Sequence, residues 1–561
     1  MPIPGGPRPA SCPPRPLTQV LARLGLPAGV AGPAAGAVEV SGVTLSSRTV
    51  RPGDLYAALP GARTHGAAHL EQALAAGAVA VLTDPAGARL LAGPDGEPAV
   101  PVLVVPEPRA VLGALAAWHY GDPGEHLATF GVTGTNGKTT TTFLLDSALR
   151  RLGERTGLIG TIEIRVGDER VLSTGTTPEA PDLHALLAVM LEHDVTTLSM
   201  EVSSHALDQH RVDGLVLDVA GFTNLSQDHL DYHRTMDAYF AAKAQLFTPA
   251  RARRGVVCVD DEWGRRLVAR STVPVTTVAS RPPVGGRPAA DWQVVDLRPV
   301  AGGRTGVDVD TPAGRLALTC PLPGDFNVAN VLLAAAMLTD SGRVDAAEAV
   351  AVLEQAGAVP GRMEPVAGAG RPGEPLAVVD YAHTPDAVEA ALAALAGRGR
   401  PLVVVLGAGG DRDADKRPRM GAAAARGADV VVVTDDNPRS EPPAQIRAAV
   451  LAGARAEARR SGAVVVEVGD RRRAVTEGVA RAWQGGVVLV AGKGHEQGQD
   501  VGGVVHPFDD RVVVHEALCT VPGPRGDQPQ QHGDQPQQHG DQPQQHGEHD
   551  PDAQEQKETQ R

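Results

Sequence analysis

The segment LATFGVTGTNGKTTTTFLLDSALRRL, residues 127–152, decides how the rest of the chain is interpreted. Its apolar start predicts a short buried strand, the glycine-containing part a loop, and the apolar spacing from Lys138 onward a helix. Backbone N–H groups at such a loop and helix N-terminus point toward an anion, and Lys138 adds a full positive charge. Thr139 follows, where a hydroxyl can bind a phosphate-bound Mg²⁺. We therefore predict a variant phosphate-binding loop, with Val132 in place of the usual first glycine; a glycine-rich turn without a nucleotide is the alternative.

Length and composition limit the number of domains, the class of partner and the cellular location that the chain can have. The 561 residues are enough for three or four domains of about 150 residues each. The net charge of −14 argues against nucleic acid as the main partner. Four cysteines without paired or metal-like spacing, the absence of a long apolar run and the lack of a signal-peptide core predict a cytoplasmic protein with no membrane insertion.

Composition also predicts the domain boundaries. Residues 1–36 are a proline-rich extension that we expect to be mostly disordered with one short helix, and residues 37–126 read as a small N-terminal α/β domain. Within it, residues 44–61 carry enough polar turn chemistry to predict a loop. Residues 520–561 contain GDQPQQH three times and are predicted to be a disordered tail.

The central domain, residues 127–357, carries polar clusters at the ends of apolar runs. Glu201 ends one apolar strand, where open α/β sheets place ligand-binding residues. His229 follows another strand, and Lys243 lies within an apolar helix. Taken singly, each has a structural explanation: a loop salt bridge, a helix cap and a surface lysine. Beside a phosphate loop, Glu201 and His229 become candidate ligands for a nucleotide-bound Mg²⁺.

The third domain, residues 358–519, reads as an open parallel α/β sheet. Four apolar strands are each followed by a polar, glycine-bearing loop, and these loops begin near residues 380, 407, 434 and 491. Ligands bind at that edge of a doubly wound sheet, so we predict a lined cleft there. Solvated loops are the alternative for any one of them.

The motifs GTNGKTT, MEVSSHAL, TNLSQDHLDYH, GDFNVAN, PGRME, DYAHTPD, GGDRD, DNPR and AGKGHE occur in this order over most of the chain. Together they resemble the Mur ligases of peptidoglycan synthesis, and most closely the members that add 2,6-diaminopimelate to UDP-N-acetylmuramoyl-L-alanyl-D-glutamate. The resemblance implies a UDP-binding N-terminal domain, a central ATPase-type domain and a C-terminal Rossmann-like domain. It also implies small-molecule substrates and a monomer.

The resemblance implies ATP-dependent amide formation. The substrate carboxylate attacks the γ-phosphate and becomes an acyl phosphate, and the amine of the diamino acid then displaces phosphate. Mg²⁺ and Lys138 would offset the repulsion between the two reacting anions. Lys243 is expected as an N-carbamate formed with CO₂, because an ammonium would repel the metal.

The resemblance also assigns roles to residues. The residues expected to act in catalysis are Lys138, Glu201, His229 and Lys243. The expected ATP contacts are Gly134, Thr135, Asn136, Gly137, Lys138, Thr139, Thr140, Asn330, Arg362, Asp380 and Lys416. The expected metal ligands are Thr139, Glu201, His229 and the carbamate of Lys243. The expected contacts to the UDP-muramoyl dipeptide are Leu45, Ser47, Thr176, Thr177, Ser204, Gln209 and Arg211. The expected diaminopimelate contacts are Arg412, Asp436, Asn437, Pro438, Arg439, Gly492 and Glu496.

Two departures and three alternatives stand beside this interpretation. Gly175 occupies a position where relatives often carry Asn, and Ala414-Asp415 replaces a common Lys-Gly. A folylpolyglutamate synthase shares the ATPase core but not DNPR or the long N-terminal domain. A lysine-adding Mur ligase differs mainly in the amino-acid pocket, and a nucleotide-binding scaffold without ligase activity would not need Lys138, Glu201, His229 and Lys243 intact.

Overall fold

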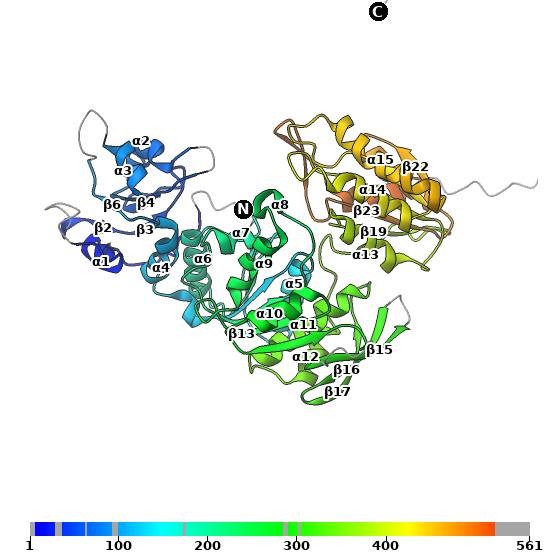
Figure 1. The fold of residues 1–561 in the computed structure, drawn as a ribbon, viewed down its shortest axis with the longest axis horizontal. Helices are drawn as coiled ribbons and strands as arrows, with labels where there is room; N and C mark the ends of the chain where they lie inside the picture. Colours follow the sequence, from blue (N-terminus) through cyan, green and yellow to red (C-terminus); the bar gives the residue numbers. More distant parts are fainter. Residues whose placement is uncertain are drawn as a thin grey trace, which may run out of the picture. The chain divides into compact units, whose positions relative to one another are not determined.

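The computed structural model describes residues 6–27, 36–61, 64–92, 99–171, 175–283, 290–300 and 304–521. The repeat-containing tail lies outside these residues, so its predicted disorder stays a prediction. The described chain forms three α/β domains in sequence order, as predicted (Figure 1). None of the described helices combines the length and apolar character needed to cross a membrane.

The N-terminal domain is built on four parallel strands in the order β3-β4-β5-β6. The buried side chains of these strands belong to two apolar clusters. Asp84 caps α3 by accepting a hydrogen bond from the backbone N–H of Gly87, and Pro85 occupies the first helical turn. The elements are β3 (Gly42–Thr44), β4 (Asp54–Ala58), η3 (Gly66–His69), α2 (Leu70–Ala75), β5 (Ala80–Thr83), α3 (Pro85–Leu91), β6 (Val102–Val104), α4 (Pro108–His119) and η4 (Pro123–His126).

The short helix predicted in the N-terminal extension is confirmed as α1, but the prediction of disorder is wrong for residues 6–16. The helix α1 (Leu17–Arg23) packs into the domain core, and β1 (Arg15–Pro16) pairs with β2 (Glu39–Val40). Arg8 binds the buried Asp54 at 2.5 Å and also donates to the Tyr120 hydroxyl. The proline content of this segment favours a prediction of disorder. The contacts that order it cannot be predicted locally, because they involve residues far away in the sequence.

The prediction that residues 44–61 form a loop is also wrong, because β4 lies within them. All five residues of β4 are buried, and the strand pairs with both β3 and β5. The strand begins with Asp54, whose carboxylate is held by Arg8 and by the backbone N–H of Arg51. These partners offset the cost of burying the Asp54 carboxylate in the domain. From composition alone, an aspartate at this position indicates a turn.

The central domain contains an eleven-stranded sheet in the order β10-β9-β8-β11-β7-β12-β13-β14-β15-β16-β17. The predicted phosphate-loop strand, β7, lies between β11 and β12 and runs parallel to both. The carboxyl ends of these three strands therefore meet at one edge. The helices α5 and α11 pack on the sheet with a continuous buried apolar cluster.

The strands of the central domain are β7 (Ala128–Thr133), β8 (Thr156–Ile159), β9 (Ile164–Val166), β10 (Glu169–Val171), β11 (Thr197–Glu201), β12 (Leu217–Phe222), β13 (Ala252–Cys258), β14 (Val275–Ala279), β15 (Trp292–Val300), β16 (Arg304–Thr311) and β17 (Gly314–Cys320). Its helices are α5 (Lys138–Arg151), α6 (Ala180–Glu192), α7 (Ser204–Asp208), α8 (Leu230–His233), α9 (Met236–Ala244), η5 (Gln245–Phe247), α10 (Glu262–Arg270), α11 (Phe326–Asp340) and α12 (Ala346–Leu353).

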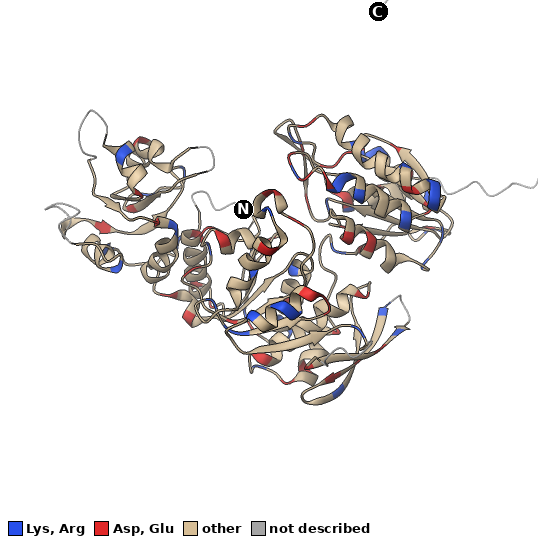
Figure 2. Cartoon of the chain, viewed as in Figure 1, with Lys and Arg blue, Asp and Glu red and all other residues tan. Residues whose placement is uncertain are grey.

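The C-terminal domain has the predicted open sheet, in the order β18-β19-β23-β20-β21-β22. All pairings are parallel except that of β18 with β19. The four strands with polar loops at their carboxyl ends, β19, β23, β20 and β21, are neighbours, so those loops share one edge. Basic and acidic residues are interspersed over the helices (Figure 2).

The strands of this domain are β18 (Glu364–Val366), β19 (Leu376–Asp380), β20 (Leu402–Leu406), β21 (Val430–Val433), β22 (Val464–Glu467), β23 (Val487–Ala491) and the hairpin β24 (Gly498–Val501) with β25 (Val504–Pro507). Its helices are α13 (Pro385–Leu395), α14 (Lys416–Gly427), α15 (Pro443–Ser461), α16 (Arg471–Ala482) and α17 (Asp510–Thr520).

Candidate active site

The loop between β7 and α5 has the backbone of a phosphate-binding loop, and two of its glycines are required. Gly134 and Gly137 have φ angles of +144° and +88°. A Cβ at Gly134 would lie 1.8 Å from the Thr223 hydroxyl oxygen, and one at Gly137 would lie 2.3 Å from the Asn330 amide oxygen. No side chain fits at either position, so the loop backbone lies directly against Thr223 and Asn330.

Two lysines converge on this loop. The Lys138 ammonium donates to the carbonyl oxygens of Gly134 and Thr135, and Lys243, which is 1% exposed, donates to Gly134 as well. Burial and the neighbouring Lys138 hold the pKa of Lys243 well below its usual range. Lys243 also lies 4.6 Å from the ring centre of Tyr239 and forms no salt bridge within the described part of the chain. A buried amine with a lowered pKa is a chemical candidate for carbamate formation.

A chain of hydrogen bonds joins the central and C-terminal domains at the start of α5. Arg362 donates to the Thr139 hydroxyl, which donates to Glu201, each over 3.0 Å. The buried Glu201 also accepts bonds from the backbone N–H and hydroxyl of Thr161. As predicted, Glu201 lies at the end of its strand and Thr139 follows the loop lysine.

These oxygens fit part of a magnesium site. Among the described residues, no group of three or more His, Cys, Asp or Glu side chains is placed to hold a metal ion by itself. Mg²⁺ bound with a nucleotide needs only one or two protein oxygens, since phosphates and water supply the rest. The Thr139 hydroxyl and the Glu201 carboxylate, hydrogen-bonded to each other, provide such a pair.

A cavity of about 430 Å³ opens beside the loop. Of the predicted ATP contacts, it is lined by Asn136, Gly137, Thr140, Asn330, Arg362 and Asp380. Burial raises the pKa of Asp380, although Arg362 and backbone N–H groups act in the opposite direction. The guanidinium of Arg362 lies 4.4 Å above the Tyr381 ring, which also lines the cavity.

His229 lies near the two lysines but makes no bond to Glu201 or Thr139. Its nearest charged partner is Asp228, at 3.4 Å, and its ring packs edge-on against His205. Burial lowers the pKa of His229 to about 4, with Lys138 and Lys243 among the causes and Asp228 opposing them. Burial would raise the pKa of Asp228, but the neighbouring His229, His383 and Lys416 lower it.

Several of the residues predicted to contact the dipeptide are joined by hydrogen bonds next to Glu201. The Thr176 hydroxyl lies 3.0 Å from that of Thr161, and Thr177 donates to the Glu201 carbonyl. Arg211 donates to the Thr177 carbonyl and to Gln209. Ser204 completes the set through a 2.9 Å bond to His233. Leu45 and Ser47 lie apart in the N-terminal domain after β3, where Ser47 donates to Gln72.

The residues predicted to bind diaminopimelate come from three of the loops at the edge of the C-terminal sheet. Arg439 donates to the Gly410 carbonyl, and a Cβ built on Gly409 would lie 3.0 Å from Arg439 and 3.8 Å from the Arg412 side chain. The backbone of Arg439 is left-handed, with φ of +51°, and is bonded to the β24–β25 hairpin through Asp500.

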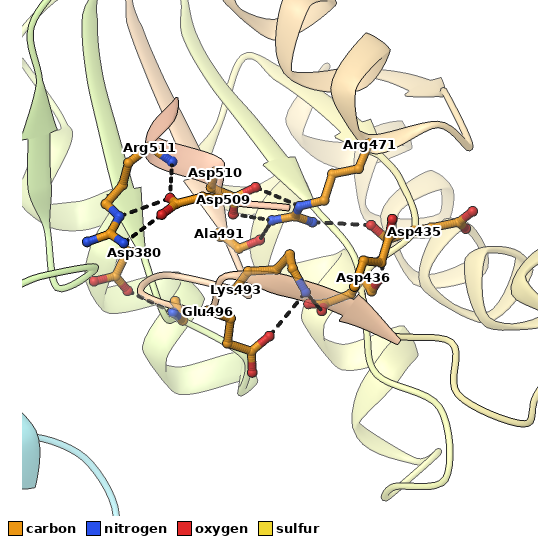
Figure 3. Close-up of polar contacts among 12 residues, drawn as sticks. Asp380, Asp435, Asp436, Arg471, Ala491, Lys493, Glu496, Asp509, Asp510 and Arg511 are labelled. Atoms are coloured by element: carbon orange, nitrogen blue, oxygen red, sulfur yellow. Dashed lines mark hydrogen bonds and ion pairs between the residues drawn. The ribbon is translucent and has the colours of Figure 1, made fainter. Parts of the chain in front are cut away.

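The other members of this predicted set lie in the same turn as Arg439 and on the loop after β23. Asn437 donates to Glu496 over 2.8 Å, and a Cβ on Gly492 would lie 2.5 Å from the Asp436 carboxylate. Figure 3 shows Asp436 and Glu496 on either side of Lys493. Pro438 is buried between Asn437 and Arg439 in the same turn.

Sequence reasoning missed residues that hold the phosphate loop from β12. Asn224 accepts a bond from the backbone N–H of Asn136 and donates back to its carbonyl, and Thr223 donates to the same carbonyl. Both follow directly after a strand adjacent to β7. The argument that singled out Glu201 at the end of β11 applies equally to them.

Sequence models of one family cover most of the chain. "Mur ligase family, catalytic domain" matches residues 39–120, "Mur ligase middle domain" residues 132–338, and "Mur ligase, glutamate ligase domain" residues 361–494. The chain belongs to the Mur ligase family. The three matches fall on the three domains of the structure.

Individual relatives of this Mur ligase are similar to it in sequence over nearly their whole length. UDP-N-acetylmuramoyl-L-alanyl-D-glutamate--2,6-diaminopimelate ligase of Streptomyces coelicolor is 52% identical over 92% of this chain and 99% of that protein. UDP-N-acetylmuramyl-tripeptide synthetase of Leifsonia xyli subsp. xyli is 48% identical with the same coverage. A solved structure of a UDP-N-acetylmuramoyl-L-alanyl-D-glutamate--2,6-diaminopimelate ligase is 32% identical, with a TM-score of 0.60 over 86% of this chain and 95% of that one.

Proposed function

We propose that this Mur ligase joins meso-2,6-diaminopimelate to UDP-N-acetylmuramoyl-L-alanyl-D-glutamate with hydrolysis of ATP to ADP and phosphate. The observation that carries the proposal is the hydrogen-bonded path from Arg362 through Thr139, Glu201 and Thr161 to Thr176. It connects the nucleotide site to the residues assigned to the dipeptide. A carboxylate held at the Thr176 turn would therefore face the phosphates at the loop.

The first step needs charge compensation, because a carboxylate and a triphosphate repel each other. A carboxylate oxygen attacks the γ-phosphorus, the bond to the β–γ bridging oxygen breaks, and ADP leaves. Lys138 and Arg362 place two cations at this position, and fixed positive groups of this kind stabilise the charge of a phosphoryl transfer state. Mg²⁺ would be held by Thr139 and Glu201 and would supply further charge neutralisation when bound.

The second step forms the amide. The amine of the diamino acid attacks the acyl carbon, loses a proton, and phosphate leaves. Arg412, Arg439, Asp436 and Glu496 supply charges of both signs at the C-terminal sheet edge, which suits an amino acid with two ammonium and two carboxylate groups. We propose that this edge presents the amine to the acyl phosphate.

We further propose that Lys243 acts as an N-carbamate and that, with His229, it lies beside a second metal position. The neutral amine would react with CO₂ and release a proton, giving an anionic oxygen donor. The supporting observations are its burial, its lowered pKa and its lack of a carboxylate partner among the described residues. Left as an ammonium, Lys243 would repel both the metal and Lys138.

The test measures ADP release and product mass with ATP, Mg²⁺, the UDP-muramoyl dipeptide and one of several amino acids, namely meso-diaminopimelate, LL-diaminopimelate, L-lysine and L-ornithine. We expect sustained ADP release only with the dipeptide and diaminopimelate, and a product mass equal to the sum of both substrates minus one water. Reactions without the dipeptide serve as controls. A lysine product formed as fast as the diaminopimelate product would contradict the proposed substrate.

A further inference from the structure

Lys493 lies between the two pocket loops and has no role in the function proposed so far. Its side chain is 0% exposed, although ammonium groups are rarely fully buried without partners. Its nitrogen donates to the Asn437 amide oxygen at 2.8 Å and to Glu496 at 3.1 Å, and lies 3.6 Å from Asp436. Three residues assigned to diaminopimelate therefore share one buried cation.

These contacts fix how the pocket residues point (Figure 3). The Asn437 oxygen accepts bonds from Lys493 and from the backbone N–H of Asp500, and its nitrogen donates to the same Glu496 oxygen that Lys493 binds. The amide cannot flip without losing all three bonds. Glu496 is held by one oxygen, which leaves its other oxygen for a ligand.

The backbones of the two loops that carry the pocket residues are held by a second buried cation, Arg471. Arg471 and Asp510 form a fully buried ion pair at 2.6 Å. The same guanidinium donates to the carbonyl oxygens of Ala491 and Asp435, the residues next to Gly492 and Asp436. Arg471 thus holds the two loop backbones, and Lys493 holds the side chains that the loops carry.

We propose, on the basis of the proposed function, that Lys493 is the positioning residue that sets the charge of the amino-acid pocket and its preference for a diacid. With Lys493, the cations Arg412, Arg439 and Lys493 are balanced by the anions Asp411, Asp436 and Glu496, since Asp411 precedes Arg412 and accepts a bond from Ser440, which follows Arg439. Diaminopimelate carries two carboxylates and two ammonium groups and has no net charge at neutral pH, whereas lysine carries one positive charge. A pocket with balanced charges suits the uncharged diacid, whereas loss of Lys493 would leave an excess of negative charge that favours the lysine cation.

The test compares Lys493→Met with wild type by steady-state kinetics in the full-length enzyme. We expect KM for diaminopimelate to rise by about tenfold or more, because removing Lys493 leaves the buried Asp436 and the half-buried Glu496 without their shared cation. KM for ATP should stay within about twofold, and the ratio of kcat/KM for diaminopimelate to that for lysine should fall by about tenfold. A change in stability alone would not alter that ratio. Lys493→Arg keeps the charge and should keep most of the preference.

Arg481→Met is the matched control, since Arg481 is on the same domain and, within the described residues, forms its salt bridge with Glu477 on the surface of α16. It should leave all of these constants unchanged. A wild-type KM and a wild-type preference in Lys493→Met would overturn the role of Lys493 while leaving the proposed function intact. A wild-type enzyme that fails to use diaminopimelate would instead refute the proposed function.

The double variant Lys493→Met/Glu496→Gln covers the case in which Lys493→Met does not fold. It removes both charges and so leaves no new unpaired carboxylate at Glu496. If Lys493 acts through Glu496, KM for diaminopimelate in the double variant should lie within about threefold of that in Glu496→Gln alone, as expected for coupled residues. A further loss of about tenfold would show independent action and overturn the proposal.

Discussion

Lys138 and Lys243 donate hydrogen bonds to the same acceptor, the carbonyl oxygen of Gly134, over 3.0 and 2.7 Å. One lysine begins α5 and the other lies in α9, so two helices place ammonium groups beside one turn of the phosphate loop. A positive charge on either amine makes protonation of the other less favourable. The shared carbonyl therefore links the residue assigned to phosphate with the residue assigned to carbamate formation.

Lys138→Ala should reduce ATP-dependent ligation by about 100-fold or more, as expected when a positioned charge donor is removed. The bonds that Lys138 donates to Gly134 and Thr135 also support the loop. We therefore expect a small fall in melting temperature together with the loss of activity. Arg150→Ala, on the exposed side of the same helix, is the control. Turnover within a few-fold of wild type in Lys138→Ala would rule out the phosphate-loop role.

Lys243→Ala should lose activity by about 100-fold or more if an anionic ligand there supports the metal. Added formate, acetate or bicarbonate should partly restore it, and should not restore Lys138→Ala. In the wild-type enzyme, ¹³C-labelled bicarbonate should give a carbamate signal by NMR that is absent from Lys243→Ala. Full activity of Lys243→Ala would show that this is an ordinary buried lysine.

The free energy of unfolding should decrease as the pH falls from about 6.5 to about 4, partly because of His119. Burial lowers the pKa of His119 in the folded protein to about 4 from an ordinary value of 6.5. Between these values the unfolded chain binds a proton that the folded chain does not, so stability is lost as the pH falls. One such proton gives a slope of at most about 1.4 kcal/mol per pH unit.

Urea unfolding at several pH values would measure this effect. His119→Leu should reduce the slope between pH 6.5 and about 4 without changing ligase activity, because His119 lies in the N-terminal domain against Tyr120. An unchanged slope in His119→Leu would assign the pH dependence to other histidines, such as the half-buried His495, whose pKa desolvation lowers to about 3.

The parts of the site that the sequence predicted are those set by local chain geometry. Strand β7, its loop and α5 lie together in the sequence, and Glu201 was identifiable because an apolar strand ends there. Lys493 and Asn224 were missed, although both lie within quoted motifs, because their importance comes from side chains on other loops. The pairing of Arg8 with Asp54 was missed for the same reason, and with it the order of residues 6–16 and the burial of β4.

The last prediction concerns the choice between diaminopimelate and lysine. The two amino acids differ at the far end, where diaminopimelate carries an extra carboxylate beside its second amine. An arginine can bind both oxygens of that carboxylate with its planar fork, and Arg439 points from the 436–439 turn toward Gly410 beside Arg412. Lysine would leave this guanidinium desolvated and unpaired. A site built to pair a polar group can reject an analogue that lacks it by about 10⁴-fold.

We therefore expect strong preference for diaminopimelate in the wild-type enzyme, and Arg439→Ala to lose that preference along with most activity. Arg439→Lys is the matched variant, because it keeps the charge and removes the fork. The backbone at residue 439 has a φ of +51°, which costs Ala and Lys about as much as Arg, so strain does not separate the three proteins. We expect Arg439→Lys to lie between the other two in its ratio of kcat/KM for diaminopimelate to kcat/KM for lysine. Comparable kcat/KM for the two amino acids in the wild-type enzyme would refute this account of the pocket, since the guanidinium would then have no carboxylate to select.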